Sequence, residues 1–422
     1  MNHAADEERP NEEERWAAIA SILPLTEALR SLWGQSDDVT WPRFLLGDSR
    51  QSLLASGAER VARLPHEAPL GDVLNTASKL GELVVGAARF APRRAGEAVA
   101  ADFEPFGGGF FFAPRDATRH PVLRCPRRNA APAALRAAAP NRYHAALRAA
   151  IAAVESGAIE KVVVARDFEL THPDGSLLDL RGQVPELVEA LLAVAGDNTR
   201  VYLLAPSCDA VWLGATPERL LRMTTGRLMT EAVAGTCRIA ENQDEVATAA
   251  AIATLLASDK DHREHQAVVD HLRVALAGFD ACVEVQPTPT IRRAPGLAHL
   301  VTPITARLAP ASSAIDVTVA LHPTPAVNGV PAADALTFLL AHEGVDRGMY
   351  AGPIGFLHPE GACFDVGIRG ALLTASGTRI FAGSGVVRGS TLAGESAETA
   401  AKASAIAESL GFRIAGVQEE SC

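Results

Sequence analysis

The order of apolar and polar positions along the chain predicts helices and strands without regular alternation. Helices are expected where apolar residues recur at helical spacing, and strands where short apolar runs are bounded by turn residues. The patterns predict helices over 143–156, 184–195, 242–277 and 395–410, and strands over 161–170, 200–214, 219–233 and 351–388. This irregular order, with several hairpin-like pairs and no internal repeat, favours a mixed α/β layered fold over a doubly wound one.

The first third of the chain has a less regular pattern. Residues 1–14 are polar and acidic, which predicts a mobile tail, and a helix is expected over Trp16–Trp33. A glycine cluster at 107–109 leads into the strand-like run Phe110–Phe112. Residues 114–142 are rich in Pro, Arg and Ala, and we interpret them as a solvated connection rather than an anion-binding patch.

Composition and charge exclude several classes of protein. The chain has 422 residues, of which 48% are hydrophobic, so it can bury one large core or two ordinary ones. The formal net charge of -11 repels phosphate backbones and anionic lipid, so we expect no binding to nucleic acid or to membrane surfaces. An anionic substrate would therefore need local cations.

The cysteines and the N-terminal segment indicate the compartment. Six cysteines lie far apart without a C-x-x-C pair, which argues against a zinc ribbon or a disulfide scaffold. The N-terminal residues lack the apolar run of a signal peptide, and no stretch reaches the roughly 18 apolar residues of a membrane span. We expect a cytoplasmic protein.

Three familiar sequence motifs, for dinucleotide binding, zinc binding and hydrolysis, do not occur with their correct spacing. The segment from Gly383 to Gly389 has the spacing G-x-G-x-x-x-G, which differs from the dinucleotide fingerprint. His262, Glu264 and His265 lack the H-E-x-x-H spacing of a zinc site. No G-x-S-x-G elbow supports a hydrolase triad.

Ten short segments, in a fixed order, carry a more specific signal. They are KVVVAR (161–166), LGATPERL (213–220), EAVAGT (231–236), SDKDHREH (258–265), HLVT (299–302), LHPTPAVNG (321–329), DRGMYAGPIG (346–355), GIRGALL (367–373), FAGSGVV (381–387) and GESAET (394–399). Together they resemble the chorismate-binding family, which is shared by isochorismate, salicylate, anthranilate and aminodeoxychorismate synthases. The resemblance implies one domain, 15–422, with the motifs in 142–410, built from large stacked, mostly antiparallel sheets with outer helices. It also implies chorismate as substrate and Mg²⁺ as cofactor.

Two residues match the family's catalytic positions. The resemblance implies that Lys161 is the general base that activates water for attack on ring carbon C2. It implies that Glu218 is the general acid that protonates the departing C4 hydroxyl, which requires a carboxyl pKa raised toward neutrality. Without the motifs, Lys161 would be a solvated strand residue and Glu218 the ion-pair partner of Arg219. Ammonia-using relatives typically lack this lysine, so we expect no glutamine amidotransferase subunit.

Four acidic residues match the family's magnesium positions. Asp261 and Glu264 are three residues apart on one predicted helix, and Glu395 and Glu398 repeat this spacing, so each pair shares a helix face. The resemblance implies that Glu264 and Glu398 bind Mg²⁺ directly, and that Asp261 and Glu395 act through water or from the outer sphere. The alternative is solvated helix faces, with Glu398 and Lys402 forming an ordinary i,i+4 pair.

A further group matches substrate-binding positions. By resemblance, Arg369, Lys402, the backbone at Gly383 and Tyr350 hold the carboxylates of chorismate, and arginine suits a planar carboxylate because it binds in two places at once. The resemblance also implies that Thr236 and His322 line the ring, and that Gly235 and Ala326 are further substrate-binding positions. The alternative, with equal support, is that His322 is a core histidine that does not contact the substrate.

The expected activity is Mg²⁺-dependent isochorismate synthesis. Ala326 favours this reaction over a salicylate synthase-type lyase that releases pyruvate, because relatives that eliminate pyruvate resemble one another in carrying threonine there. A noncatalytic chorismate-binding protein is the third alternative, and it has no need of both Lys161 and Glu218. The sequence leaves open whether the isochorismate is used to make menaquinone, a catecholate siderophore or salicylate. It also leaves open whether the chain is a monomer or a weak dimer.

Overall fold

The structure of the protein is a computed structural model. It describes residues 19–20, 24–33, 41–48, 50–93, 100–122, 130–196, 198–239, 245–279, 281–294, 297–309 and 311–418. The acidic tail expected at 1–14 lies outside these ranges.

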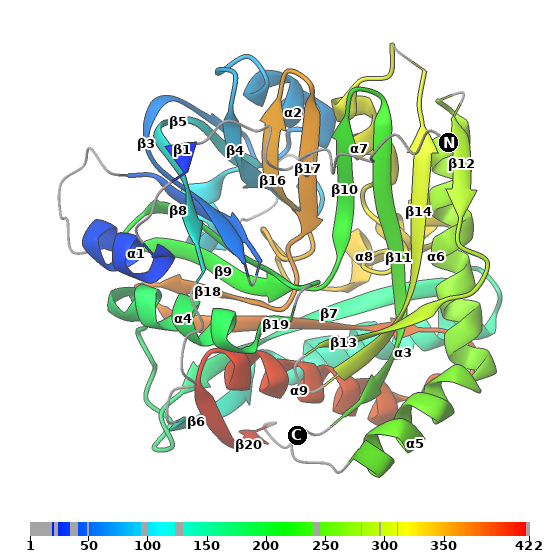
Figure 1. Cartoon of the computed structure of the whole chain (residues 1–422). Helices are drawn as coiled ribbons and strands as arrows, with labels where there is room; N and C mark the ends of the chain where they lie inside the picture. The colour runs from blue at the N-terminus through cyan, green and yellow to red at the C-terminus, as the bar shows by residue number, and fades with distance from the viewer. Residues whose placement is uncertain are drawn as a thin grey trace, which may run out of the picture.

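The described residues form the following helices and strands (Figure 1). The helices are α1 (Leu25–Trp33), α2 (Leu70–Ala77), α3 (Pro140–Glu155), α4 (Val184–Val194), α5 (Glu245–Leu256), α6 (Asp259–Ala277), α7 (Ala314–Leu321), α8 (Ala332–His342) and α9 (Leu392–Ser409). The strands are β1 (Ile19–Ala20), β2 (Arg43–Gly47), β3 (Gln51–Leu64), β4 (Val84–Ala88), β5 (Gly109–Pro121), β6 (Ala131–Ala137), β7 (Lys161–Thr171), β8 (Arg200–Ser207), β9 (Ala210–Thr216), β10 (Arg219–Thr224), β11 (Arg227–Arg238), β12 (Cys282–Val285), β13 (Thr290–Ala294), β14 (Leu297–Arg307), β15 (Gly329–Val330), β16 (Pro353–His358), β17 (Gly361–Val366), β18 (Gly370–Thr374), β19 (Gly377–Val386) and β20 (Phe412–Gln418).

The strands join into one long sheet that folds over on itself. Its hydrogen-bonded order runs β6–β7–β19–β18–β9–β8–β2–β3–β5–β4–β16–β17–β10–β11–β14. These pairs are antiparallel, whereas β1 with β5 and β6 with β20 are parallel. The prediction of large, mostly antiparallel layers is confirmed.

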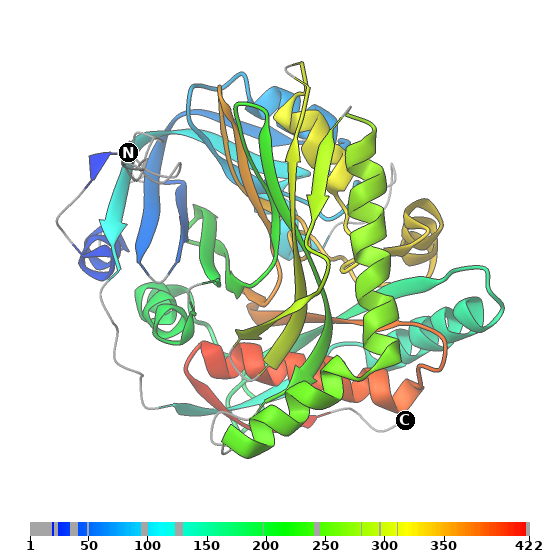
Figure 2. The same cartoon turned by 45° about the vertical axis from the view of Figure 1, so that its right-hand side comes forward.

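Helices cover the outer faces of this sheet. Figure 2 shows α6 lying along β11 and β14, and α9 lying along β19, which it also contacts. Buried side chains form two clusters, one around Phe111, Trp212 and Phe364 and a second, mostly aliphatic one around Leu191 and Leu213. No helix in the described ranges is both long enough and apolar enough to span a membrane.

Several predicted elements are confirmed and others need correction. The helices over 143–156, 184–195 and 395–410 correspond to α3, α4 and α9, and Gly411 follows α9 with φ 89° as expected. The predicted helix over 242–277 is two helices, because Ser258 caps α6 by accepting a hydrogen bond from the Asp261 N–H.

Two predictions in the first third are wrong. The helix expected over Trp16–Trp33 occupies Leu25–Trp33 in the described residues, and Ile19–Ala20 pair as a strand with β5. The described parts of 114–142 are not simply a solvated connection, since β5 extends to Pro121 and β6 spans Ala131–Ala137. Ladder pairing with β3 and β7 holds these segments in the sheet.

Candidate active site

Lys161 is a buried residue with an acidic partner. It opens β7, its side chain is 2% exposed, and its Nζ donates a hydrogen bond to Oε1 of Glu264 on α6 at 2.7 Å. Gly385 on β19 makes room for this pair, because a Cβ there would lie 2.8 Å from Glu264 Oε1 and 3.0 Å from Lys161 Cε. The alternative of a solvated strand lysine is therefore wrong.

Glu218 is buried in the turn between β9 and β10. Burial raises its pKa from 4.5 to about 7, and the nearby Glu231 adds to this effect. The Thr324 hydroxyl donates a hydrogen bond to Glu218 Oε1 at 3.1 Å, which works in the opposite direction. Within the described structure the carboxyl contacts Thr324, not the neighbouring Arg219, so it can hold a proton near neutral pH.

Lys161 and Arg369 link Glu218 to the predicted carboxylate-binding residues. Both cations lie close enough to Glu218 to lower its pKa. Arg369 also interacts electrostatically with Tyr350 and Glu398, while burial lowers the pKa of its guanidinium. The proposed base, acid and substrate-binding groups thus share one electrostatic environment.

Lys402, Gly383 and Tyr350 meet beside β19. Lys402 Nζ donates a hydrogen bond to the Gly383 carbonyl at 2.9 Å and pairs with Glu398 Oε1 at 2.7 Å. A Cβ at Gly383 would lie 3.1 Å from the Tyr350 hydroxyl, whose ring stacks on Phe381. Burial raises the pKa of Tyr350 to about 12, so its hydroxyl stays protonated and can donate.

The predicted substrate-binding residues Gly235 and Thr236 lie at a bulge in β11. The register with β14 shifts between Ala234 and Thr236, and Gly235 has φ 76°. A Cβ at Gly235 would lie 3.2 Å from Cβ of Asp261, so the bulge faces the start of α6. Glycine suits this position because side chains disfavour positive φ.

His299 was not singled out from the sequence, yet it belongs to this cluster. Its Nδ1 lies 2.9 Å from Thr236 Oγ1. Burial, followed by the charges of Arg369, Lys402 and Arg292, lowers its pKa well below the usual value, so the ring is neutral. Its place in the segment HLVT was the only sequence signal.

His322 and Ala326 lie in the segment between α7 and β15. His322 Nε2 lies 2.9 Å from the Phe90 carbonyl, and burial lowers the histidine pKa to about 4. This contact matches the alternative of a packed histidine. Ala326 is partly buried against the larger core cluster. The same segment contains Thr324, whose hydroxyl donates a hydrogen bond to Glu218.

The four predicted metal ligands each have another neighbour in this structure. Glu264 is paired with Lys161, and Glu398 with Lys402. Asp261 lies by Gly235, and Glu395 is buried on α9. Within the described ranges, no three or more His, Cys, Asp or Glu side chains are grouped closely enough to hold a metal ion. Carboxylate oxygens are the ligands that Mg²⁺ prefers. To bind the ion, Glu264 and Glu398 would have to give up their ion pairs with Lys161 and Lys402.

Glu231 and Arg292 form a further buried pair that the sequence did not reveal. Two guanidinium nitrogens of Arg292 donate to the two oxygens of Glu231 at 2.6 and 2.8 Å, and one also donates to the Pro217 carbonyl. This bidentate pair fixes the backbone just before Glu218. It therefore helps to position Glu218.

Comparison with known proteins agrees with this arrangement. A family model described as a chorismate binding enzyme matches residues 118–411. The "Salicylate biosynthesis isochorismate synthase" of Pseudomonas aeruginosa is 39% identical over 304 residues, which cover 71% of this chain and 61% of the relative. "Isochorismate synthase MenF" of Bacillus subtilis is 31% identical over 268 residues, covering 63% and 55%. The chain thus spans about three fifths of the length of these relatives.

Solved structures show the same fold. The menaquinone-specific isochorismate synthase of Escherichia coli matches with a TM-score of 0.71 at 23% identity, over 92% of each chain. At this identity the likeness establishes the arrangement of elements and nothing finer.

Proposed function

The chain belongs to the chorismate-binding enzyme family, whose model matches residues 118–411, and we propose that it is an isochorismate synthase. The observation that carries the proposal is the pairing of two proton carriers in one buried site. Lys161 is 1% exposed and lies within electrostatic range of Glu218, whose pKa is raised to about 7. A base and a protonated acid are what hydroxyl exchange on a ring requires.

In the proposed reaction, Lys161 Nζ in its neutral form takes a proton from a water molecule that attacks ring carbon C2. Glu218 gives its proton to the hydroxyl that leaves C4. The ring double bonds shift between these two carbons, so one hydroxyl is gained, one is lost, and the product is an isomer. The reverse reaction exchanges the two roles, which makes the conversion reversible.

The substrate proposed for this site is the dicarboxylate chorismate. Arg369 and Lys402 supply positive charge in a protein whose formal net charge is -11. The protonated Tyr350 hydroxyl adds a neutral donor. Because the site is buried, these charges act with less solvent screening than at the surface.

We include Mg²⁺ in the proposal, with Glu264 and Glu398 as its ligands and Asp261 and Glu395 in support. When bound, the ion would neutralise a substrate carboxylate and orient it. The side chains of Glu264 and Glu398 are 18% and 37% exposed, so an ion can reach them. Binding would require each carboxylate to exchange its lysine for the ion.

Two other activities remain as alternatives. A lyase that releases pyruvate would use the same acid and base, and Ala326 argues against it because alanine has no hydroxyl to orient the intermediate. A protein that only binds chorismate would not need a buried lysine beside a protonated carboxyl. Lys161 also argues against ammonia chemistry, and hence against an amidotransferase partner.

Product analysis tests the proposal. Purified protein is incubated with chorismate and Mg²⁺, and the products are separated and identified, with pyruvate followed through lactate dehydrogenase. We expect a mixture of chorismate and isochorismate with negligible pyruvate, and some pyruvate release from Ala326→Thr. Stoichiometric pyruvate and salicylate from the unmutated protein would instead identify a lyase.

A further inference from the structure

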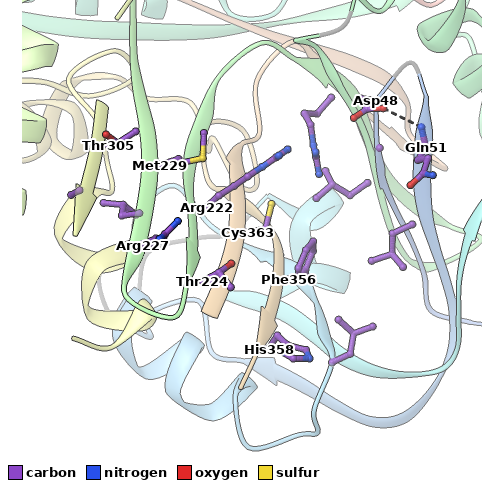
Figure 3. Close-up of a pocket in the computed structure, with 18 of the residues that line it drawn as sticks. Asp48, Gln51, Arg222, Thr224, Arg227, Met229, Thr305, Phe356, His358 and Cys363 are labelled. Carbon is purple, nitrogen blue, oxygen red and sulfur yellow. Dashed lines mark hydrogen bonds between the residues drawn. The ribbon is translucent and has the colours of Figure 1, made fainter. Parts of the chain in front are cut away.

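Glu343 and Arg347 form a buried ion pair in the segment that follows α8. Their side chains are 5% and 4% exposed. Nε and Nη2 of the guanidinium donate hydrogen bonds to the two carboxylate oxygens, at 2.7 and 2.6 Å. Neither residue lines the cavity of about 480 Å³ that Figure 3 shows beside β10, β16 and β17. The pair is therefore held inside the protein, away from that cavity.

The pair takes the place of a strand along one edge of β7. On that edge, β15 reaches only the start of β7, and β6 pairs only with its end. Between them, Glu343 Oε1 accepts a hydrogen bond from the Ala165 N–H at 2.7 Å. Arg347 Nη2 donates one to the Val163 carbonyl at 2.6 Å. Since buried backbone groups need partners, these contacts hold β7 in place two residues after Lys161.

The same guanidinium also holds the turn that leads to the proposed acid. Arg347 Nη1 donates a hydrogen bond to the Val327 carbonyl at 2.7 Å. The Val327 N–H donates to the Thr324 carbonyl at 3.1 Å. The Thr324 hydroxyl then donates to Glu218 Oε1, also at 3.1 Å. Three successive hydrogen bonds thus connect Arg347 to Glu218.

This set of contacts suits arginine and not lysine. The planar guanidinium presents donors in fixed directions, whereas the lysine ammonium is a compact point charge. The guanidinium carbon of Arg347 lies 4.1 Å from the centre of the Phe90 ring, whose carbonyl lies 2.9 Å from His322 Nε2. An arginine that only neutralised Glu343 would not need to hold two backbone carbonyls as well.

From this geometry we propose that Arg347 is a positioning residue for both proton carriers of the proposed isochorismate synthase. Through one carbonyl it holds the strand that carries Lys161, and through the other it holds the Thr324 hydroxyl on Glu218. Its hydrogen bonds in the described structure go to a carboxylate and two carbonyls, so it acts through other residues. The inference rests on the proposed function, which assigns the acid and the base.

Arg347→Lys separates this role from charge neutralisation, because the variant keeps the positive charge and loses the fork. The charged groups that act on the acid all remain; they are Lys161, Glu231 and Arg369. We expect kcat for chorismate to fall about tenfold or more, since the acid and the base lose their fixed positions. KM should change little, because Arg347 is not among the proposed substrate-binding groups.

The alkaline limb of the pH profile should move to higher pH in Arg347→Lys. The Thr324 hydrogen bond lowers the pKa of Glu218, so loosening it lets this pKa rise, and the acid stays protonated to higher pH. In Arg347→Lys/Thr324→Val, the limb should lie where Thr324→Val alone places it, since both changes act on one hydrogen bond. The matched control is Arg379→Lys, which loses a fork paired with Asp167 on the same strand and should leave the limb in place.

The titration of Glu218 can also be followed without turnover. Infrared difference spectra, with Glu218→Gln as the blank, report the protonated carboxyl, whose midpoint near pH 7 should rise in Arg347→Lys. The two proposals can therefore fail separately. A wild type that makes no isochorismate refutes the proposed function, whereas an unmoved midpoint in folded Arg347→Lys refutes the positioning role. Lower thermal stability with an unmoved limb would mean that the pair only completes the edge of β7.

Glu343→Gln replaces Arg347→Lys if the lysine variant does not fold. The amide oxygen can still accept the Ala165 N–H, while the amide NH₂ cannot accept from the guanidinium, so one bond of the fork is lost. The midpoint of Glu218 should again rise. A folded Glu343→Gln with the wild-type midpoint would overturn the proposal.

Discussion

Lys161 is the residue on which the proposed proton transfers depend most. Its Nζ is buried and bonded to Glu264, so it has a fixed position from which to take a proton from water. We expect Lys161→Ala to lose isomerisation by on the order of a hundredfold, since general-base help contributes at least that much. Lys79→Ala, at an exposed lysine, is the control. Turnover is measured by coupling isochorismate to an isochorismatase, and wild-type rates in Lys161→Ala would remove this residue from the mechanism.

Glu218 should set the alkaline limit of activity. Its pKa is about 7, and an acid catalyst must be protonated, so turnover of chorismate should fall as the pH rises through about 7. The Thr324 hydrogen bond lowers this pKa. Removing the bond in Thr324→Val raises the pKa, and the alkaline limb of the pH profile should move to higher pH.

The control for Thr324→Val is Thr337→Val, whose hydroxyl bonds only to an exposed turn of α8. A limb that stays in place in Thr324→Val, or moves equally in the control, would show that Thr324 does not tune the acid.

The sequence predicted some residues of this site and not their partners. Lys161, Glu218 and Arg369 were predicted because each lies in a contiguous motif, and Lys402 because it lies just after the last one. Thr324 and His299 contact residues 106 and 63 positions away, and such contacts depend on the folded sheet. For the same reason, Glu264 was predicted only as a metal ligand, while the structure places it on Lys161.

At the scale of elements, the approach of β19 to α6 determines the geometry of the site. Gly385 on β19 leaves the space in which Glu264 reaches Lys161. A Cβ at this position would displace the Glu264 carboxylate, which is the end of a flexible side chain. We therefore expect Gly385→Ala to lower activity about tenfold or more, since a displacement near 1 Å misplaces a catalytic group. Thermal stability should change little.

Gly416→Ala on β20 is the matched control, because nothing lies within 4 Å of an added Cβ there. Activity and thermal unfolding are measured on both variants. Unchanged activity in Gly385→Ala would mean that the close approach has no catalytic role.

Elements were predictable where one short pattern determined them. The periodic helices α3, α4 and α9 needed no knowledge of their neighbours. The second half of β5 and all of β6 were missed because proline and arginine in 114–142 suggested solvent, whereas pairing with β3 and β7 keeps these segments in strands. The break before α6 depends on a single capping serine inside a long helical pattern.

At the scale of the whole molecule, the proposed function requires an acidic protein to bind an acidic substrate. We expect activity to require Mg²⁺, so thorough EDTA treatment should abolish turnover and added Mg²⁺ should restore it. The ion should also raise the thermal midpoint of the wild type, since a ligand that binds only the folded state stabilises it. This shift should disappear in Glu264→Gln/Glu398→Gln and persist in Glu155→Gln, at an exposed end of α3. Turnover that survives metal removal would contradict the assignment.

The most direct test of the account follows the oxygen atom. If Lys161 activates water for attack at C2 while Glu218 releases the C4 hydroxyl, isochorismate formed in ¹⁸O-water must carry one solvent oxygen, located at C2. Mass spectrometry and the ¹³C shift of C2 measure the label in product formed at low conversion. The account predicts one ¹⁸O atom per isochorismate, at C2. Isochorismate without label, or no isochorismate at all, would contradict it.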